Sequence, residues 1–187
     1  MDRMTNSDTL PIRRATVADA RTIAQIDVAG WQAAYRGILP DDFLDEMSIS
    51  AREAALESRL QRDEGDRAPA WIAERGGAAI GFVSSGPPRD EDVPLPAAEI
   101  YAIYVLPDAR RSGAGRALLT AAVDDWRARG VTTLTLWVLE GNAPACAFYE
   151  ATGWRPDGAR QQLEIARTSL TEIRYRLALA APLPGSS

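Results

Sequence analysis

The 187-residue sequence contains no histidine and no lysine, and its single cysteine is Cys146. Without histidine, neither a Ser-His-Asp nor a Cys-His catalytic arrangement can form, and no imidazole can bind a metal ion. Without lysine, a Schiff-base lysine and the lysine of a Walker A loop are both excluded. One cysteine alone excludes an intrachain disulfide and a cysteine-rich zinc site. We therefore expect no metal centre.

Long apolar runs and a basic surface are also missing. No stretch of about 18 apolar residues occurs, so no transmembrane helix is expected, and the polar segment 1–10 does not resemble a signal peptide. The 26 acidic residues outnumber the 21 basic ones, all of them arginine, giving a formal net charge of −5. Binding to nucleic acid requires positive charge against the phosphates. We expect a soluble, cytoplasmic protein that binds neither nucleic acid nor membrane.

The composition is that of one ordinary globular domain, with 46% hydrophobic and 25% charged residues. We predict a single domain over residues 10–180, a flexible N-terminal segment 1–9 and a C-terminal tail 181–187. Apolar periodicity predicts helices after Thr16, over 41–47, 50–62 and 116–129, and after Asn142. It predicts strands over 10–15, 70–75, 78–84, 98–106 and 131–139, and a final pair that ends near residue 179.

The strand–helix–strand order over 98–139 is a βαβ unit, whose two strands should be parallel. The loop in this unit, 110–115, follows a strand and opens a helix. The first helical amides have no partner within the helix, and the helix dipole is positive there, so the loop can bind an anion such as a pyrophosphate. The alternative is a tight turn with solvated arginines. The spacing fits neither a Walker A loop nor a Rossmann fingerprint.

The same loop matches the Arg/Gln-x-x-Gly-x-Gly/Ala signature with which the GNAT superfamily of N-acetyltransferases binds acetyl-coenzyme A (acetyl-CoA). The segments 138–142, 148–150 and 152–154 are similar to that family's Asn-to-Tyr helix and its closing Gly-aromatic pair. Residues 98–101 resemble the strand that carries an acidic residue in the family, and 31–37 resemble its acceptor-side helices. The resemblance covers residues 12–179, nearly the whole chain.

This resemblance implies an α/β fold in which a central mixed sheet, flanked by helices, has two splayed parallel strands. It implies an acetyl-CoA-dependent N-acetyltransferase that acts by direct transfer, with no metal. Of the catalytic groups, the Val105 N–H would hold the oxyanion. The implied cofactor-binding residues are Ile103, Tyr104, Val105, Arg110, Arg111, Ser112, Gly113, Ala114, Gly115, Arg116, Asn142, Ala145 and Phe148.

Three side chains leave alternatives open. Glu99 is the best candidate for the base, directly or through water; otherwise it binds a cationic acceptor or is a solvated strand residue. Tyr149 is the best candidate for the acid that protonates the leaving thiolate; otherwise it only packs in the helix. Asn142 either binds the pantetheine arm or only caps its helix.

Trp31 and Tyr35 lie four residues apart, on one helical face, and would either form the floor of an acceptor pocket or pack in the core. With Glu99 they are the expected substrate-binding residues. The acceptor would be a small-molecule amine or a peptide N-terminus. A homodimer through the final strand is possible by analogy. The competing hypotheses are a non-catalytic acyl-CoA sensor and an unrelated nucleotide-phosphate binder.

Overall fold

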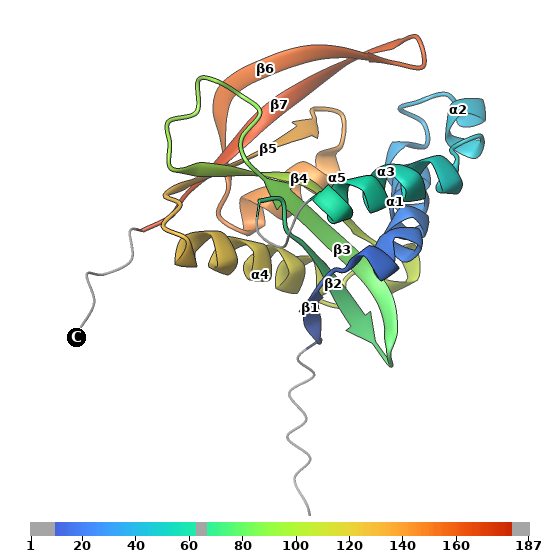
Figure 1. The fold of residues 1–187 in the computed structure, drawn as a ribbon. Helices are drawn as coiled ribbons and strands as arrows, with labels where there is room; N and C mark the ends of the chain where they lie inside the picture. The colour runs from blue at the N-terminus through green and yellow to red at the C-terminus, as the bar shows by residue number, and fades with distance from the viewer. Residues whose placement is uncertain (1–9, 63–66, 181–187) are drawn as a thin grey trace, which may run out of the picture.

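The computed structural model describes residues 10–62 and 67–180. The segments expected to be flexible, 1–9 and 181–187, lie outside the described residues. The centre of the molecule is a seven-stranded sheet with the order β1-β2-β3-β4-β5-β7-β6 (Figure 1). Its strands are β1 (Ile12–Arg14), β2 (Ala70–Arg75), β3 (Ala78–Gly86), β4 (Ala97–Val105), β5 (Thr133–Leu139), β6 (Arg155–Ile165) and β7 (Thr168–Ala178).

Helices cover both faces of this sheet (Figure 1). On one face, α1 and α3 pack through Ile23, Ile26 and Leu56 onto Ile72 and Phe82. On the other, α4 buries an apolar stripe formed by Leu118, Leu119, Ala122, Val123 and Trp126. The helices are α1 (Ala20–Tyr35), α2 (Asp41–Asp45), α3 (Ile49–Arg62), α4 (Ala114–Ala128) and α5 (Ala143–Ala151), with 3-10 turns at Val17–Asp19 and Pro107–Ala109. Within the described ranges, no helix is long and apolar enough to cross a membrane.

Local chemistry explains several of these boundaries. The Thr16 N–H donates to the Asp19 carboxylate over 2.8 Å, as a capping box requires. Gly76 and Gly77 have φ values of +60° and +79°, which the tight turn between β2 and β3 demands. The Asn142 side chain accepts a 3.2 Å hydrogen bond from the Ala145 N–H and so caps α5.

The sheet opens into a wedge between β4 and β5, the two parallel strands. They pair only over residues 97–100 of β4 and 133–136 of β5. Beyond this level β4 continues along β3 as far as Val105, and β5 continues along β7 as far as Leu139. The splayed parallel pair that the family resemblance implies is therefore present.

A bulge in β4 lies at the start of this opening. Ser85 pairs with Ile100 and Ser84 with Ala102, so Tyr101 is an extra residue in the ladder. Ile100 and Ile103 both contact the core under α4, whereas Ala102 and Tyr104 contact the cluster under α1 and α3. The bulge thus turns the end of β4 so that Tyr104 faces α1.

The last strand does not lie at the edge of the sheet, as the suggested dimer contact would require. β7 pairs with β5 on one side and with β6 on the other. β6 forms the edge, and the β6–β7 hairpin extends past the end of β5 (Figure 1). The final strand therefore offers no free edge for pairing with a second copy, because both of its edges are already paired; the homodimer stays a prediction.

Candidate active site

The loop between β4 and α4 borders the wedge. Gly113 caps α4 with a φ of +88°, and Arg111 is also left-handed, with a φ of +61°. Arg110, Arg111 and Arg116 are exposed, and none of them forms an ion pair with another described residue. Ser112 is exposed beside them, and Ala114 is buried at the start of the helix. The loop thus presents backbone amides and three cationic side chains, an arrangement suited to a phosphate group.

Gly115 brings this loop against both walls of the wedge. A Cβ at Gly115 would lie 3.5 Å from Phe148 Cζ of α5 and 3.8 Å from Val105 Cγ2 of β4. The start of α4, the end of β4 and the middle of α5 therefore meet at one place. Of the predicted cofactor-binding residues, Val105, Gly115 and Phe148 are brought together here.

The wedge-facing edge of β4 offers backbone groups that β5 does not use. The Leu106 N–H donates to the Ile80 carbonyl of β3 over 2.8 Å. Successive residues of a strand direct their N–H and C=O groups to opposite sides, so those of Val105 and Ile103 point into the wedge. An extended ligand can hydrogen-bond to this edge as an added strand would.

Tyr104, one of the predicted cofactor-binding residues, packs against α1. A Cβ on Gly30 of α1 would lie 2.4 Å from Tyr104 Cδ1, so this ring packs directly on α1. Its hydroxyl lies 3.3 Å from that of Tyr35. By the alternation of the strand, its backbone groups point toward β3. Tyr104 therefore lies on the α1 side of the wedge, and its role in binding the cofactor stays a prediction.

Tyr149 of α5 is buried in the hydrophobic core. Its ring lies among those of Phe148, Trp154 and Tyr175, with ring centroids 5.4–6.2 Å away. Burial raises the pKa of Tyr149, and the nearby Tyr35 and Cys146 raise it further. A phenol with a raised pKa stays protonated at neutral pH, the state that a proton donor needs. The two alternatives for Tyr149, proton donor or packing residue, are both compatible with this placement, so the acid role stays a prediction.

Cys146, also on α5, is not poised for nucleophilic chemistry. Its side chain is half-buried, and burial raises the pKa of the thiol above its ordinary value. A nucleophilic cysteine needs the opposite shift, toward the thiolate. We therefore read Cys146 as a packing residue of the helix.

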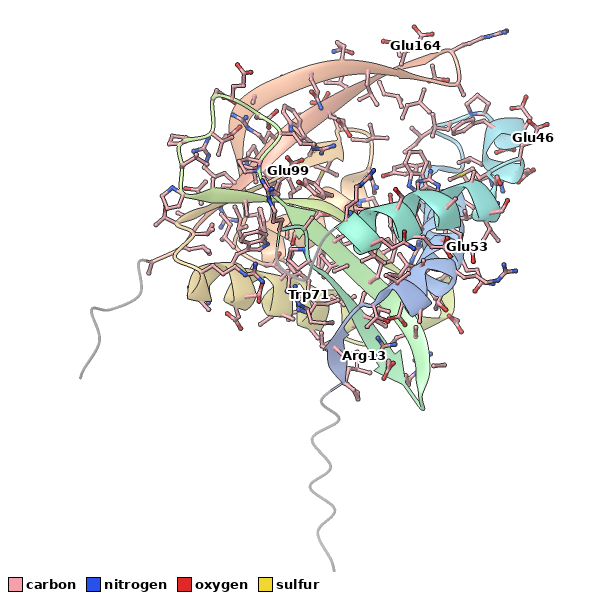
Figure 2. All side chains as sticks on the ribbon, in the orientation of Figure 1. Arg13, Glu46, Glu53, Trp71, Glu99 and Glu164 are labelled. Atoms are coloured by element: carbon pink, nitrogen blue, oxygen red, sulfur yellow. The ribbon has the colours of Figure 1, made fainter. Side chains whose placement is uncertain are left out.

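The structure does not favour Glu99 as the base. Its side chain is fully buried, and both carboxylate oxygens accept hydrogen bonds from Arg89. Oε2 accepts from the Arg89 N–H over 2.9 Å, and Oε1 accepts from Nε over 3.0 Å and from Nη2. Figure 2 shows Glu99 on β4, on the side of the loop that joins β3 to β4. Its observed contacts therefore hold that loop, and a base would need a free oxygen facing the acceptor.

Trp31 borders an open cavity, whereas Tyr35 packs beside it and against Tyr104. The rings of Trp31 and Tyr35 meet edge to face with centroids 4.8 Å apart. Trp31 and Tyr104 line a cavity of about 480 Å³ between α1, α3, β3 and β4. Its other lining residues are Asp27, Ala51, Arg52, Ala55, Leu56, Arg59, Phe82, Ser84, Tyr101 and Ala102.

Sequence reasoning missed the charged groups around this cavity. Asp27 is buried on α1 and binds Arg52 of α3 over 2.6 Å, while Arg52 also lies over the Trp31 ring at 5.0 Å. Burial raises the pKa of Asp27, and the Arg52 charge opposes the shift. The apolar helical spacing of Ile23, Ala24 and Ile26 carried no sign that Asp27 would point inward.

A second charged group, Arg174, joins the β3–β4 loop to strand β7. Arg174 of β7 is 4% exposed and binds Asp90, Asp92 and Asp157 at 3.1, 2.7 and 2.8 Å. Asp90 also accepts a 2.8 Å hydrogen bond from Trp137 Nε1 of β5. This network fixes the loop over the base of the wedge. Among the described residues, no group of three or more metal-binding side chains occurs.

Comparison with known proteins shows to which family a chain with this wedge belongs. Residues 31–154 match the model of the acetyltransferase (GNAT) family. A Bacillus subtilis (strain 168) protein named uncharacterized N-acetyltransferase YuaI is 33% identical over 164 residues, or 87% of this chain and 89% of that protein. The chain belongs to the GNAT family. As a GNAT member it is an acetyl-CoA-dependent acyltransferase, as the sequence predicted.

Solved structures show the same GNAT fold. The PaiA N-acetyltransferase from Thermoplasma acidophilum, in complex with coenzyme A, superposes with a TM-score of 0.74 at 17% identity, over 91% of this chain and 99% of that one. A ribosomal-protein-alanine N-acetyltransferase from Brucella melitensis gives a TM-score of 0.68 at 28% identity, over 91% and 100%. The mixed sheet with helices on both faces is confirmed.

Proposed function

We propose that the protein transfers the acetyl group of acetyl-CoA to a primary amine by direct attack within a ternary complex. The observation that carries this proposal is the open wedge between β4 and β5, bordered by the amides that start α4. The pantetheine arm would pair with Ile103 and Val105, and the pyrophosphate would lie on the loop 110–116. Asn142, Ala145 and Phe148 would line the α5 side of the arm.

The residues at the head of the wedge have matching chemical roles. The amine nitrogen attacks the thioester carbon, and the Val105 N–H holds the oxygen that becomes negative; such a donor contributes about 3 kcal/mol to barrier lowering. The carbon–sulfur bond then breaks, and the Tyr149 hydroxyl gives its proton to the departing thiolate. The amine releases its own proton to solvent, from which Tyr149 is reprotonated. The products are the acetylated amine and coenzyme A with a free thiol.

The acceptor would enter from the side of α1 and α3. This face carries the Trp31 and Tyr35 rings and the cavity beside them. The name of one similar protein states an acceptor, since the Brucella melitensis protein is called a ribosomal-protein-alanine N-acetyltransferase. A peptide N-terminus and a small primary amine are therefore both to be tested here.

The test is a screen for thiol release from acetyl-CoA with small amines and an alanine-led peptide, followed by mass spectrometry of the acceptor. Because the chain has no lysine, acetylation of its own side-chain amines cannot compete with the acceptor. Arg111→Gln should raise the KM for acetyl-CoA about tenfold, whereas Arg75→Gln, at the remote β2–β3 turn, should leave it unchanged. Acetyl-CoA binding without acetylation of any amine would refute the proposal.

A further inference from the structure

A carboxylate on β7, Glu172, lies at the open end of the wedge. It pairs in register with Leu139, the last residue of β5. Two residues along β7, Arg174 contacts Asp90 of the β3–β4 loop and the Trp137 ring. Side chains two apart on a strand share a face, so Glu172 lies on that same face of the sheet. This face is the one that α1 covers with Tyr35.

Glu172 acts electrostatically across the wedge. Burial is the main cause of the raised pKa of Tyr35, and the charge of Glu172 raises it further. Glu172 also contributes to the raised pKa of Arg89, whose largest cause is its hydrogen bond to Glu99. Yet the Glu172 side chain hydrogen-bonds only to Gln161 Nε2 among the described residues, over 2.7 Å. The carboxylate is near Tyr35 without being bonded to it.

Glu172 differs in its partners from the other carboxylates of this face. Asp27 is neutralised by Arg52, Glu99 by Arg89, and Asp90 by Arg174. Within residues 10–62 and 67–180, Glu172 forms no ion pair, and its amide partner is neutral. It is only partly buried, so water solvates the carboxylate when no ligand is bound, and a cationic group can take the place of that water.

We propose that Glu172 holds the ammonium group of the acceptor between β7 and the Tyr35 hydroxyl; this group releases one proton to solvent before its nitrogen, then a neutral amine, attacks the thioester carbon. This inference rests on the proposed acetyl transfer, and it names the acceptor's recognition chemistry: a protonated primary amine, from a small molecule or a peptide N-terminus. The Tyr35 hydroxyl oxygen faces the Glu172 carboxylate across the bound ammonium, and it is held by a 3.3 Å hydrogen bond with the Tyr104 hydroxyl. The Trp31 and Tyr35 rings lie beside the bound cation and accommodate the carbon chain next to it.

The experiment compares Glu172→Gln with the wild type on three acceptors at neutral pH. Butylamine and alanine amide are cations there, whereas 2,2,2-trifluoroethylamine is neutral. Loss of one charge-assisted hydrogen bond should raise the KM for the two cations about ten- to hundredfold. The KM for the neutral amine should change less than twofold, which a general structural defect would not produce. Glu164→Gln, far out on the same hairpin (Figure 2), is the matched control.

A second measurement does not need turnover: calorimetric titration of butylamine into the coenzyme A-loaded protein. Binding that Glu172→Gln weakens tenfold or more supports the inference even if no thiol is ever released, and that combination would refute only the proposed acetyl transfer. Equal KM values in wild type and Glu172→Gln for both butylamine and alanine amide would overturn the Glu172 assignment while leaving acetyl transfer intact. Failure of the wild type to bind or acetylate any cationic amine would overturn the assignment as well. A loss confined to alanine amide would identify a peptide N-terminus as the source of the ammonium.

Discussion

Replacing Glu99 with glutamine separates a structural carboxylate from a catalytic one. The Glu99 side chain is fully buried and receives three hydrogen bonds from Arg89. In Glu99→Gln an amide NH₂ group faces the guanidinium, so at least one charge-assisted hydrogen bond is lost, at about 1.5–3 kcal/mol. The Arg89 side chain is 63% exposed and can turn to water, so the cost stays below the range for a fully buried pair. We expect a loss of about 2 kcal/mol in unfolding free energy.

The assay is thermal and urea unfolding of wild type, Glu99→Gln, Arg89→Met and the double variant. A loss of about 2 kcal/mol corresponds to a Tm lower by about 4–8 °C in a chain of this length. Since both single variants break the same interaction, their effects should not add, and the double variant should resemble either one. At a temperature where all four are folded, kcat should change less than about threefold.

A different pattern would refute this reasoning. If Glu99→Gln kept the wild-type Tm but lost a hundredfold or more in kcat, Glu99 would be the base after all. Arg89→Met would then be expected to keep most of its activity, because it leaves the carboxylate in place. The acidic limb of the pH–rate profile would also vanish in Glu99→Gln alone.

Three further predictions concern the acid, the loop and the first turn. Tyr149→Phe should lower kcat about ten- to hundredfold with a Tm within about 3 °C of wild type, since its hydroxyl bonds to no other described residue; an unchanged kcat would exclude the acid role. Gly113→Ala, at a φ of +88° with nothing within 4 Å of the added Cβ, should cost about 1 kcal/mol and raise the KM for acetyl-CoA severalfold. Gly77→Ala, at +79° in a remote turn, should cost the same with no change in KM, and equal KM effects would contradict the loop assignment. The hydrogen bond from Arg13 is the largest of the causes that lower the pKa of Asp19 to about 2. The Asp19 carboxylate therefore stabilises the fold fully at pH values above the pKa of Asp19 in the unfolded chain, and this stabilisation is lost as the pH falls toward 2. Asp19→Asn should thus be about 1 kcal/mol less stable at pH 7, after allowance for exposure, and no less stable near pH 2, as urea unfolding would show.

Local rules predicted most of the elements because their signals are local. The glycine pair between β2 and β3, the Thr16 capping box and the apolar stripe of α4 each lie within a few residues. Even so, Ser48, and not Ser50, accepts the 3.2 Å hydrogen bond from the Ala51 N–H that starts α3. Two serines of equal capping strength, two residues apart, cannot be distinguished by propensity alone.

The site was predicted unevenly for a different reason. The loop after β4 is contiguous, so its composition and spacing predicted its place between a strand and a helix, while its role in binding the cofactor stays a prediction. The partners of Glu99 and Arg174 come from the β3–β4 loop, 10 and more than 80 residues away in the chain. Such pairs form only when the fold brings distant charges together, and no spacing pattern in a single sequence predicts which charges will meet. The same holds for Glu172, whose position follows only from the register of β5 and β7.

The four paired rungs at the narrow end of β4 and β5 have a mechanical consequence. Because Arg174 of β7 binds Asp90 and Asp92 of the β3–β4 loop, moving β4 and β5 further apart would break several charged contacts. We therefore expect the slot between β4 and β5 to change little when a ligand enters, so that little ordering entropy is lost when it fills. Affinity at this slot should depend on the fit of the ligand and hardly at all on closure of the protein around it.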